Sequence, residues 1–265
     1  MFLLGVGDDG NGRAIVSYGN PDTSKNVSAY VPGLATALDG DFADGTVRRA
    51  LQTAKGAYKY NHSTAFIVWL GYDAPGFTEV GSTADADKGA PAYRSFMEGI
   101  QATNEKENPH ITAIGHSYGS LVVGTAAREH GGIPGVDDIV LLGSPGTGAQ
   151  SASELNVGDG HVFAASAGND PVSWLPARSG LLGPVPAVLS NMDGDRWFGK
   201  DPVSDGFGAT RIESGDGPLP MWLSGEGPTP AHSGYFDPDR NPSAANNMAK
   251  IVAGRSDLVT TEEGR

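Results

Sequence analysis

The chain contains no cysteine among its 265 residues. This excludes disulfide bonds, thiol catalysis and cysteine-ligated zinc sites, but it does not identify the compartment. Long apolar runs are also missing, since no stretch approaches the roughly 20 apolar residues of a membrane-spanning helix. The first residues, MFLLGVG, have no basic segment and only a short apolar run, unlike a signal peptide. We therefore expect a cytoplasmic protein by default, with secretion left open for a chain that is processed or trimmed.

Basic residues are scarce: 18 lysines and arginines stand against 31 aspartates and glutamates, giving a formal net charge of −13 at pH 7. This balance argues against nucleic acids and anionic membranes as partners, and solubility is its simplest explanation. Hydrophobic content is also low, at 38%, whereas the chain has 39 glycines and 18 prolines. Because several clear strands are present, we interpret these residues as long ordered loops within one domain spanning residues 1–265.

Motifs for nucleotide cofactors and metals are missing as well. The Gly-x-Gly pairs at Gly5 and Gly10 lack the strand and helix of a dinucleotide-binding unit, and no G-x-x-x-x-G-K-[ST] motif occurs. Asp8, Asp9 and Asn11 superficially resemble a calcium loop, but no glutamate follows at the required spacing. We therefore expect neither a cofactor nor a metal.

Hydrophobic patterning predicts strands that alternate with helices after residue 45. Continuous apolar runs such as 65–70 are typical of strands buried on both faces of a parallel sheet. Expected strands cover residues 2–6, 13–18, 26–31, 65–70, 111–114, 138–142, 161–165 and 209–213. Expected helices cover residues 45–60, 84–108 with a start or break at Pro91, 118–130, and 244–255 capped by Ser243. This order predicts an α/β fold with a mainly parallel central sheet and helices on both faces.

Residues 172–208 interrupt this pattern. Prolines and glycines break the segment repeatedly, and its apolar residues are scattered. We interpret it as a cap-like excursion over the active-site edge, because long excursions are commonly functional or disordered and its aromatic residues favour function.

The most informative stretch is Gly115-His116-Ser117-Tyr118-Gly119, between an apolar strand and a helical pattern. It has the form G-x-S-x-G, the nucleophile elbow in which a serine stands at the apex of a sharp strand-to-helix turn. Gly115 and Gly119 fit positions where strand and helix come too close for a Cβ atom. Since glycine is abundant in this chain, the prediction depends on this context. We predict Ser117 as a nucleophile.

A serine nucleophile needs an adjacent base, usually a histidine that a carboxylate orients. In this fold the chain order is serine, acid, histidine. His130 ends the elbow helix and His161 opens a strand at the wrong edge, so neither can face Ser117. His232 follows the last strand and is the predicted base; an ordinary surface histidine is the alternative. His116 points away from the nucleophile, into structural hydrogen bonding.

Asp170 is the predicted acid, because it follows the strand 161–165 and can reach a histidine on the neighbouring loop. Its alternative is an ordinary Asp-Pro turn. Asp216, after the last strand, is the best rival, whereas Asp73 precedes Ser117 and breaks the chain order. Four further aspartates lie in the excursion and are less constrained: Asp193, Asp195, Asp201 and Asp205.

The tetrahedral intermediate of acyl transfer needs backbone donors. One is the N–H of Tyr118, the residue after the nucleophile, which also opens the elbow helix. The second comes from a loop after an earlier strand. Here that loop is Val31-Pro32-Gly33-Leu34, in which Gly33 permits the turn and Leu34 N–H is the predicted donor. A plain turn from strand to helix is the alternative.

With these residues in place, the chain resembles the α/β-hydrolase superfamily and, more narrowly, an actinobacterial α/β-hydrolase family catalogued as a domain of unknown function. The matching pieces, spread from about residue 14 to residue 240, are NVSAYVPGL at 26–34, VWLGYDAP at 68–75, GHSYGS at 115–120, GSPG at 143–146, NDPV at 169–172 and HSGYF at 232–236. The resemblance implies a serine hydrolase with Ser117, Asp170 and His232 as its triad. The resemblance does not identify a substrate.

We therefore predict a carboxylic ester hydrolase that acts on a small-molecule acyl ester through an acyl-enzyme intermediate. An acyltransferase, a lactonase or a peptidase would use the same triad. A non-catalytic binding protein on a hydrolase scaffold is the alternative of another class. Fold does not fix substrate, and neither acyl length nor oligomeric state follows from the sequence.

Overall fold

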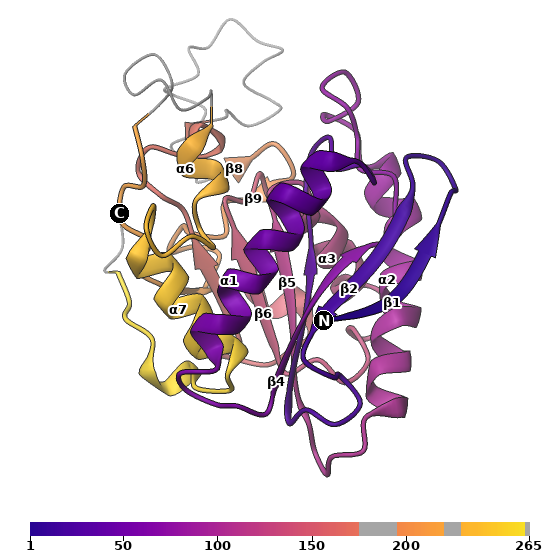
Figure 1. The fold of residues 1–265 in the computed structure, drawn as a ribbon. Coiled ribbons are helices and arrows are strands. Elements are labelled where there is room, and N and C mark those ends of the chain that lie inside the picture. The colour runs from indigo at the N-terminus through magenta and orange to yellow at the C-terminus, as the bar shows by residue number, and fades with distance from the viewer. Residues whose placement is uncertain (175–194, 220–228, 263–265) are drawn as a thin grey trace, which may run out of the picture.

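The computed structural model describes residues 1–174, 195–219 and 229–262. Its centre is an eight-stranded sheet in the order β1-β2-β4-β3-β5-β6-β7-β10 (Figure 1). The strands are β1 (Phe2–Gly7), β2 (Arg13–Tyr18), β3 (Asn26–Val31), β4 (Thr64–Leu70), β5 (His110–His116), β6 (Asp138–Leu142), β7 (Val162–Ala165) and β10 (Thr210–Arg211). The β1–β2 and β2–β4 pairs are antiparallel, and the other pairs are parallel. The expectation of a mainly parallel sheet is confirmed.

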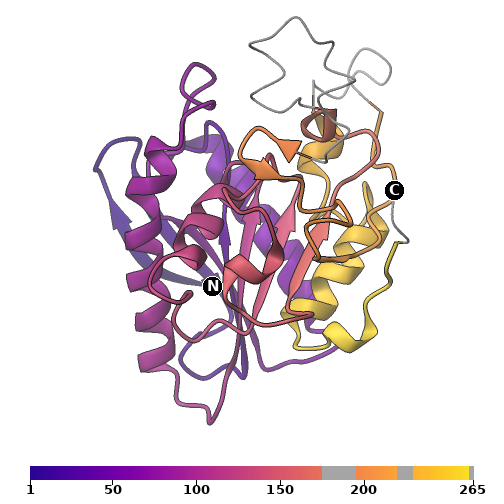
Figure 2. The same cartoon turned by 180° about the vertical axis from the view of Figure 1, so that it is seen from behind.

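Helices cover both faces of this sheet, which explains why β3, β4 and β6 are buried along their whole length. On one face lie α1 (Arg48–Ala57), which continues a π-helical segment at Phe42–Val47, and α7 (Pro242–Val252). On the other lie α2 (Ala84–Thr103) and α3 (Gly119–Arg128). Figure 1 shows α1 and α7 in front of the sheet. Figure 2, from the opposite side, shows α2 and α3 in front of it.

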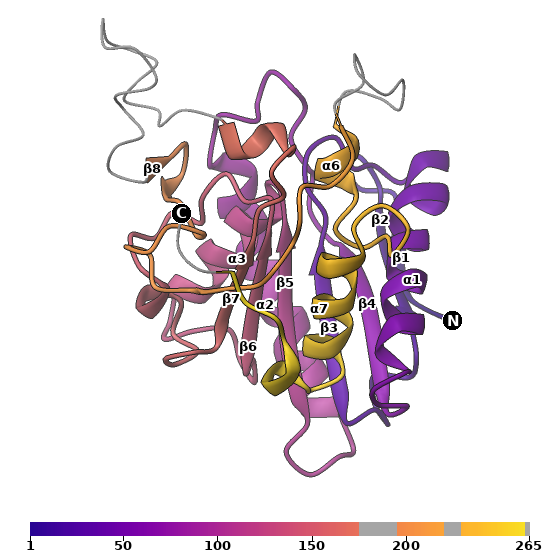
Figure 3. The ribbon, with the colours of Figure 1, turned by 90° about the vertical axis from the view of Figure 1, so that its left-hand side faces the viewer.

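Shorter elements complete the described chain. They are the helical turns η2 (Ala152–Leu155), η3 (Pro171–Trp174), α6 (Pro230–Ser233) and η5 (Ser256–Leu258), and the hairpin β8 (Asp195–Arg196) and β9 (Gly199–Lys200). Among the described residues no helix is both long and apolar enough to span a membrane. Figure 3 shows α6 and β8 at the edge of the sheet where the parallel strands end.

Several sequence expectations were wrong in detail. α2 runs through Pro91 without a break, because Pro91 lies on the exposed side while the buried side continues through Ala90, Tyr93 and Met97. The cap of α7 is Asn241, whose side chain accepts a hydrogen bond from Ala244 N–H at 3.1 Å, and not Ser243.

The last strand and the histidine after it also differ from expectation. Only Thr210–Arg211 pair with β7, because the chain then leaves the sheet and forms a single bridge from Ile212 to Thr261. His232 lies in the short helix α6, not in a loop. Within the excursion expected at 172–208, residues 175–194 lie outside the described part, so Asp193 is not placed.

Candidate active site

Ser117 stands between the end of β5 and the start of α3 with a φ of 56°, a conformation that is strained for a residue other than glycine. The turn is tight on both sides. A Cβ atom on Gly115 would lie 2.5 Å from Ser120 Cα, and one on Gly119 would lie 2.1 Å from Val31 O. Both positions therefore require glycine, as expected for a nucleophile elbow.

Asp170 and His232 form a hydrogen-bonded pair at the same edge of the sheet. His232 Nδ1 lies 2.9 Å from Asp170 Oδ2 and 3.0 Å from Oδ1. The carboxylate is fully buried, and two further donors hold it: Tyr235 OH at 2.6 Å from Oδ2 and Val172 N–H at 2.9 Å from Oδ1. Tyr235 OH in turn accepts a hydrogen bond from Ala167 N–H at 2.9 Å.

These partners keep Asp170 ionised. Burial by itself raises the pKa of the carboxyl group, but the hydrogen bond and charge of His232, together with Tyr235 and Val172 N–H, outweigh it, so the pKa lies below its ordinary value. A buried anion that accepts the Nδ1 proton fixes the imidazole tautomer. His232 Nε2 is then left with a lone pair.

Gly143, at the end of β6, brings this pair and Ser117 together. A Cβ atom on Gly143 would lie 2.6 Å from Asp170 Oδ2 and 2.9 Å from His232 Nδ1. The residue before it, Leu142, accepts a hydrogen bond from Ser117 N–H at 2.9 Å. No hydrogen bond joins Ser117 Oγ to His232 in the described residues. Such bonds between nucleophile and base are often long until substrate binds.

The loop after β3 lies directly on Ser117. A Cβ atom on Gly33 would lie 2.6 Å from Ser117 Cβ and 3.0 Å from its Oγ. Within the described chain neither Leu34 N–H nor Tyr118 N–H donates to a backbone carbonyl. Neither N–H is thus taken by a backbone acceptor, as a donor to a ligand oxygen would require.

Hydrogen bonds on every side fix this loop. Tyr72 OH donates to Pro32 O at 2.7 Å, and Ala35 N–H donates to Pro75 O at 2.9 Å. Thr36 Oγ1 donates to Gly33 O at 2.8 Å. Because Pro32 O, Gly33 O and Ala35 N–H are all hydrogen-bonded, the peptide between Gly33 and Leu34 is held in one orientation.

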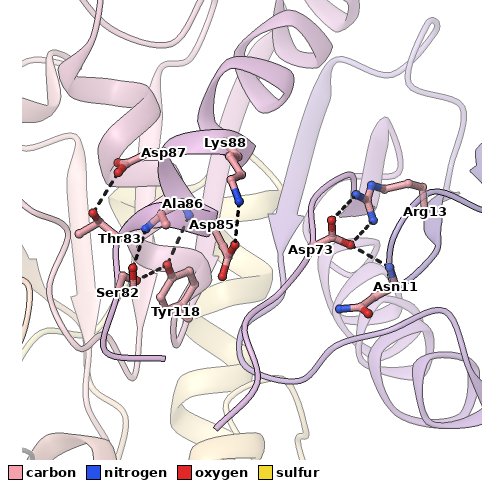
Figure 4. Close-up of polar contacts among 11 residues, drawn as sticks. Asn11, Arg13, Asp73, Ser82, Thr83, Asp85, Ala86, Asp87, Lys88 and Tyr118 are labelled. Carbon is pink, nitrogen blue, oxygen red and sulfur yellow. Dashed lines mark hydrogen bonds and ion pairs between the residues drawn. The ribbon is translucent and has the colours of Figure 1, made fainter. Parts of the chain in front are cut away.

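The side chain of Tyr118 ties the elbow to the start of α2. Its OH donates to Ser82 O at 2.6 Å and accepts from Ala86 N–H at 3.3 Å (Figure 4). Burial is the main reason that the pKa of Tyr118 rises to about 12, so the phenol stays protonated. The ring of Phe198 in the β8–β9 hairpin packs edge-on against it, with 5.9 Å between ring centroids. This part of the excursion therefore lies next to the elbow.

Asp73, which the chain order excludes as the acid of the triad, has a structural role. Its carboxylate receives both terminal nitrogens of Arg13 at 2.8 Å and Asn11 N–H at 2.8 Å (Figure 4). The hydrogen bond from Arg13 is the largest reason that the pKa of Asp73 lies below its ordinary value. Asp73 thus attaches the β1–β2 hairpin to the loop that carries Tyr72.

His116 and His161 make hydrogen bonds of their own. His116 Nε2 lies 2.7 Å from the backbone oxygen of His232, and its pKa is well below the ordinary value, mainly through burial and then through His232 and Arg49. A neutral His116 therefore donates to that carbonyl, which holds α6 in place. This is the structural hydrogen bond expected from the sequence. His161 instead binds the buried Asp138, with 2.7 Å between Nδ1 and Oδ1, near the start of the strands.

Sequence reasoning did not find Tyr235 or Gly143. Tyr235 follows His232 by three residues, as it would on a helical turn, but nothing in the sequence indicates that its hydroxyl reaches Asp170. Gly143 has a φ of 51° directly after a strand. A glycine at the carboxyl end of a strand next to the elbow strand is the available signal for a close approach.

A family model described as alpha/beta hydrolase matches residues 8–179. The chain belongs to the alpha/beta hydrolase family. An uncharacterized protein of Mycobacterium tuberculosis is 33% identical to this hydrolase over an alignment of 273 positions, gaps included, which covers 96% of this chain and 39% of the relative. The chain thus spans about two fifths of that relative's length. An uncharacterized protein of Mycobacterium bovis is 36% identical over an alignment of 187 positions, gaps included, which covers 68% of this chain and 69% of its own length.

Two solved esterases match this chain at low sequence identity. Esterase LipW from Mycobacterium marinum is 13% identical, with a TM-score of 0.49 over 95% of this chain and 81% of its own. An esterase from Pyrobaculum calidifontis is also 13% identical, with a TM-score of 0.49 over 92% of this chain and 82% of its own.

Proposed function

We propose that this α/β hydrolase cleaves carboxylic esters of small molecules through a triad of Ser117, His232 and Asp170. The observation that carries the proposal is the buried, hydrogen-bonded pair of Asp170 and His232 beside a serine in strained backbone geometry. Strain of this kind persists only where the surrounding structure enforces it, and it clusters at active sites.

In the proposed mechanism, His232 Nε2 takes the proton of Ser117 Oγ as that oxygen attacks the ester carbonyl. The carbonyl oxygen becomes an oxyanion, which the N–H groups of Leu34 and Tyr118 stabilise. When the intermediate collapses, the C–O bond to the alcohol breaks and His232 gives its proton to the departing alkoxide. A water molecule, deprotonated by His232, then attacks the acyl-enzyme. The bond between the acyl carbon and Ser117 Oγ breaks as His232 returns its proton to Oγ, and the carboxylic acid is released. Asp170 stays ionised and stabilises the imidazolium throughout.

Acyl transfer, lactone opening and peptide cleavage use the same groups and differ in the second nucleophile or the leaving group. Residues 175–194, which belong to the excursion expected from the sequence, lie outside the described chain. The binding-protein alternative is less well supported, because a scaffold without catalysis has no need of a buried anion that accepts hydrogen bonds from His232, Tyr235 and Val172 N–H beside the strained serine.

Labelling with a fluorophosphonate, followed by peptide mass mapping, tests the proposal. We expect a single adduct on Ser117 in the folded protein and none after unfolding. Ser120→Ala is the matched control: Ser120 lies one turn away, its Oγ bonds to Gly115 O at 3.1 Å, and its loss should leave the label in place. A folded protein that takes no label, or takes it on another serine, overturns the nucleophile assignment. Esters of graded acyl length, assayed beside lactones and amides, then identify the substrate class.

Tyr235→Phe is expected to lower kcat about tenfold with little change in KM, equivalent to about 1.4 kcal/mol of transition-state stabilisation. The variant keeps the ring but removes the 2.6 Å hydrogen bond to Asp170 Oδ2, so the carboxylate orients His232 less well. The measurement is steady-state kinetics of p-nitrophenyl ester hydrolysis across a pH range.

Tyr93→Phe is the control for a merely structural effect of losing a tyrosine hydroxyl. Tyr93 is equally buried and donates to Ala29 O at 2.9 Å, on the other side of the sheet from Tyr235. Both variants should lose similar thermal stability, but only Tyr235→Phe should change kcat. Equal kcat values for the two variants would contradict the positioning role of Tyr235.

A further inference from the structure

The strand β1 forms an edge of the central sheet with unusual surface character. In the described part of the chain it pairs with β2 alone, so its other side presents unpaired N–H and C=O groups (Figure 1). Edge strands in proteins are normally protected by charge, proline, a β-bulge or a covering element. Residues 1–7, MFLLGVG, contain no charged residue and no proline, and the strand carries one irregularity of register, between Leu3 and Gly5.

Both faces of this strand are exposed. Leu3 is 64% exposed and Val6 is 68% exposed, and they lie opposite Val16 and Ala14 of β2. Phe2, which is 45% exposed, pairs with Ser17 on the other face, because successive side chains of a strand point to opposite sides. Leu3 and Val6 share a face because the register shifts by one residue between Leu3 and Gly5. A bilayer or a single helix would cover one face and leave the backbone groups unpaired. An additional strand pairs the backbone groups, and its side chains contact those of β1 on both faces.

We propose that the outer edge of β1 pairs antiparallel with β1 of a second copy of this chain, which joins the two sheets in a symmetric dimer. The register that keeps like faces together places Leu3 opposite Val6 of the other copy, and Val6 opposite its Leu3. The same register places Phe2 opposite Gly7, which leaves room for the ring, and puts the irregularity between Leu3 and Gly5 at the middle of the paired strands, with regular pairs on either side of it. A closed two-fold arrangement of this kind uses one surface twice.

Charge favours the same occupant. Two copies with a net charge of −13 each repel one another over most of their surfaces. The outer edge of β1 is uncharged over its length, and the nearest carboxylates, Asp8 and Asp9, lie in the turn beyond Gly7. The strand can therefore approach its own copy without placing like charges opposite one another.

Sedimentation velocity and light scattering over a wide range of protein concentration test the dimer. The wild type should show twice the mass of the 27.3 kDa chain. The double variant Leu3→Lys, Val6→Lys should show a single mass, because four lysines would then face one another across the two-fold axis. Both side chains are already exposed in one copy, so the variant should fold and keep its thermal stability.

Phe77→Lys is the matched control, because Phe77 is 81% exposed but lies in the loop after β4. It should remain dimeric. A wild type that is monomeric at every concentration, or a dimer that survives the double lysine variant, overturns the proposal. So does a monomeric wild type that instead floats with phosphatidylcholine vesicles, since that result would assign the apolar edge to a lipid surface.

Discussion

Asp170→Asn is expected to lower kcat for ester hydrolysis about 10⁴-fold with KM little changed, as removing the negative charge of a triad aspartate does in serine hydrolases. The carboxylate is the acceptor for His232 Nδ1 at 2.9 Å, and it is fully buried. An asparagine amide can donate to Nδ1 instead, which places the imidazole proton on Nε2, where it faces the serine. The base is then in the wrong tautomer. Steady-state kinetics with p-nitrophenyl esters gives the measurement.

Asp216→Asn is the matched control, because Asp216 is the rival acid by chain order. In the structure Asp216 is exposed; its backbone oxygen accepts from Asn169 N–H at 2.9 Å, and its carboxylate lies beside Gly168. Its replacement should leave kcat within about twofold, since an exposed group away from the reacting atoms supplies little transition-state stabilisation. A large loss at Asp216 together with normal activity of Asp170→Asn would reverse the assignment.

The same substitution changes how stability depends on pH. The pKa of Asp170 is lower in the folded protein than the ordinary value of about 3.9. Its ionisation therefore stabilises the folded state above about pH 4, and this contribution is lost as the pH falls through the folded pKa. In urea titrations between about pH 5 and pH 2, Asp170→Asn should show a shallower loss of unfolding free energy than the wild type. Parallel curves would contradict this effect.

The parallel sheet explains which residues of the site could be predicted from the sequence. Its strands end at one edge, so residues just past β5, β6 and β7 meet there even though they are distant along the chain. That rule, with the chain order of serine, acid and histidine, was enough to select Asp170 and His232, which the structure places 2.9 Å apart. Their catalytic roles stay predictions.

The missed features depend on geometry finer than that rule. The direction of the Tyr235 hydroxyl depends on how α6 sits against the loop that follows β7, and no local pattern specifies it. The cap of α7 could have been found, because Pro242 occupies the first position of the helix and marks Asn241 as the residue before it. The length of β10 could not have been predicted, because the residue after it, Ile212, forms a bridge with Thr261 of the distant C-terminal segment.

Gly33→Ala should show whether the loop after β3 supplies an oxyanion donor. We expect kcat to fall at least about 100-fold, which is the usual effect of losing one such donor. An added methyl group would lie 2.6 Å from Ser117 Cβ and 2.9 Å from His116 O, so the loop must move away from the nucleophile. Leu34 N–H would move with it. Crowding of this kind destabilises a fold by about 1–3 kcal/mol, so thermal unfolding should be measured alongside the ester kinetics.

Gly40→Ala provides the control, because Gly40 lies in the same connection between β3 and α1 and a Cβ atom there would meet nothing within 4 Å. Its kinetics should match the wild type. The rate of fluorophosphonate labelling separates two explanations of a low kcat in Gly33→Ala, since the phosphonyl oxygen needs the same donors as the ester carbonyl oxygen. A folded Gly33→Ala protein with normal labelling and normal kcat would show that Leu34 N–H does not stabilise the transition state. The second donor would then have to come from another part of the edge above Ser117.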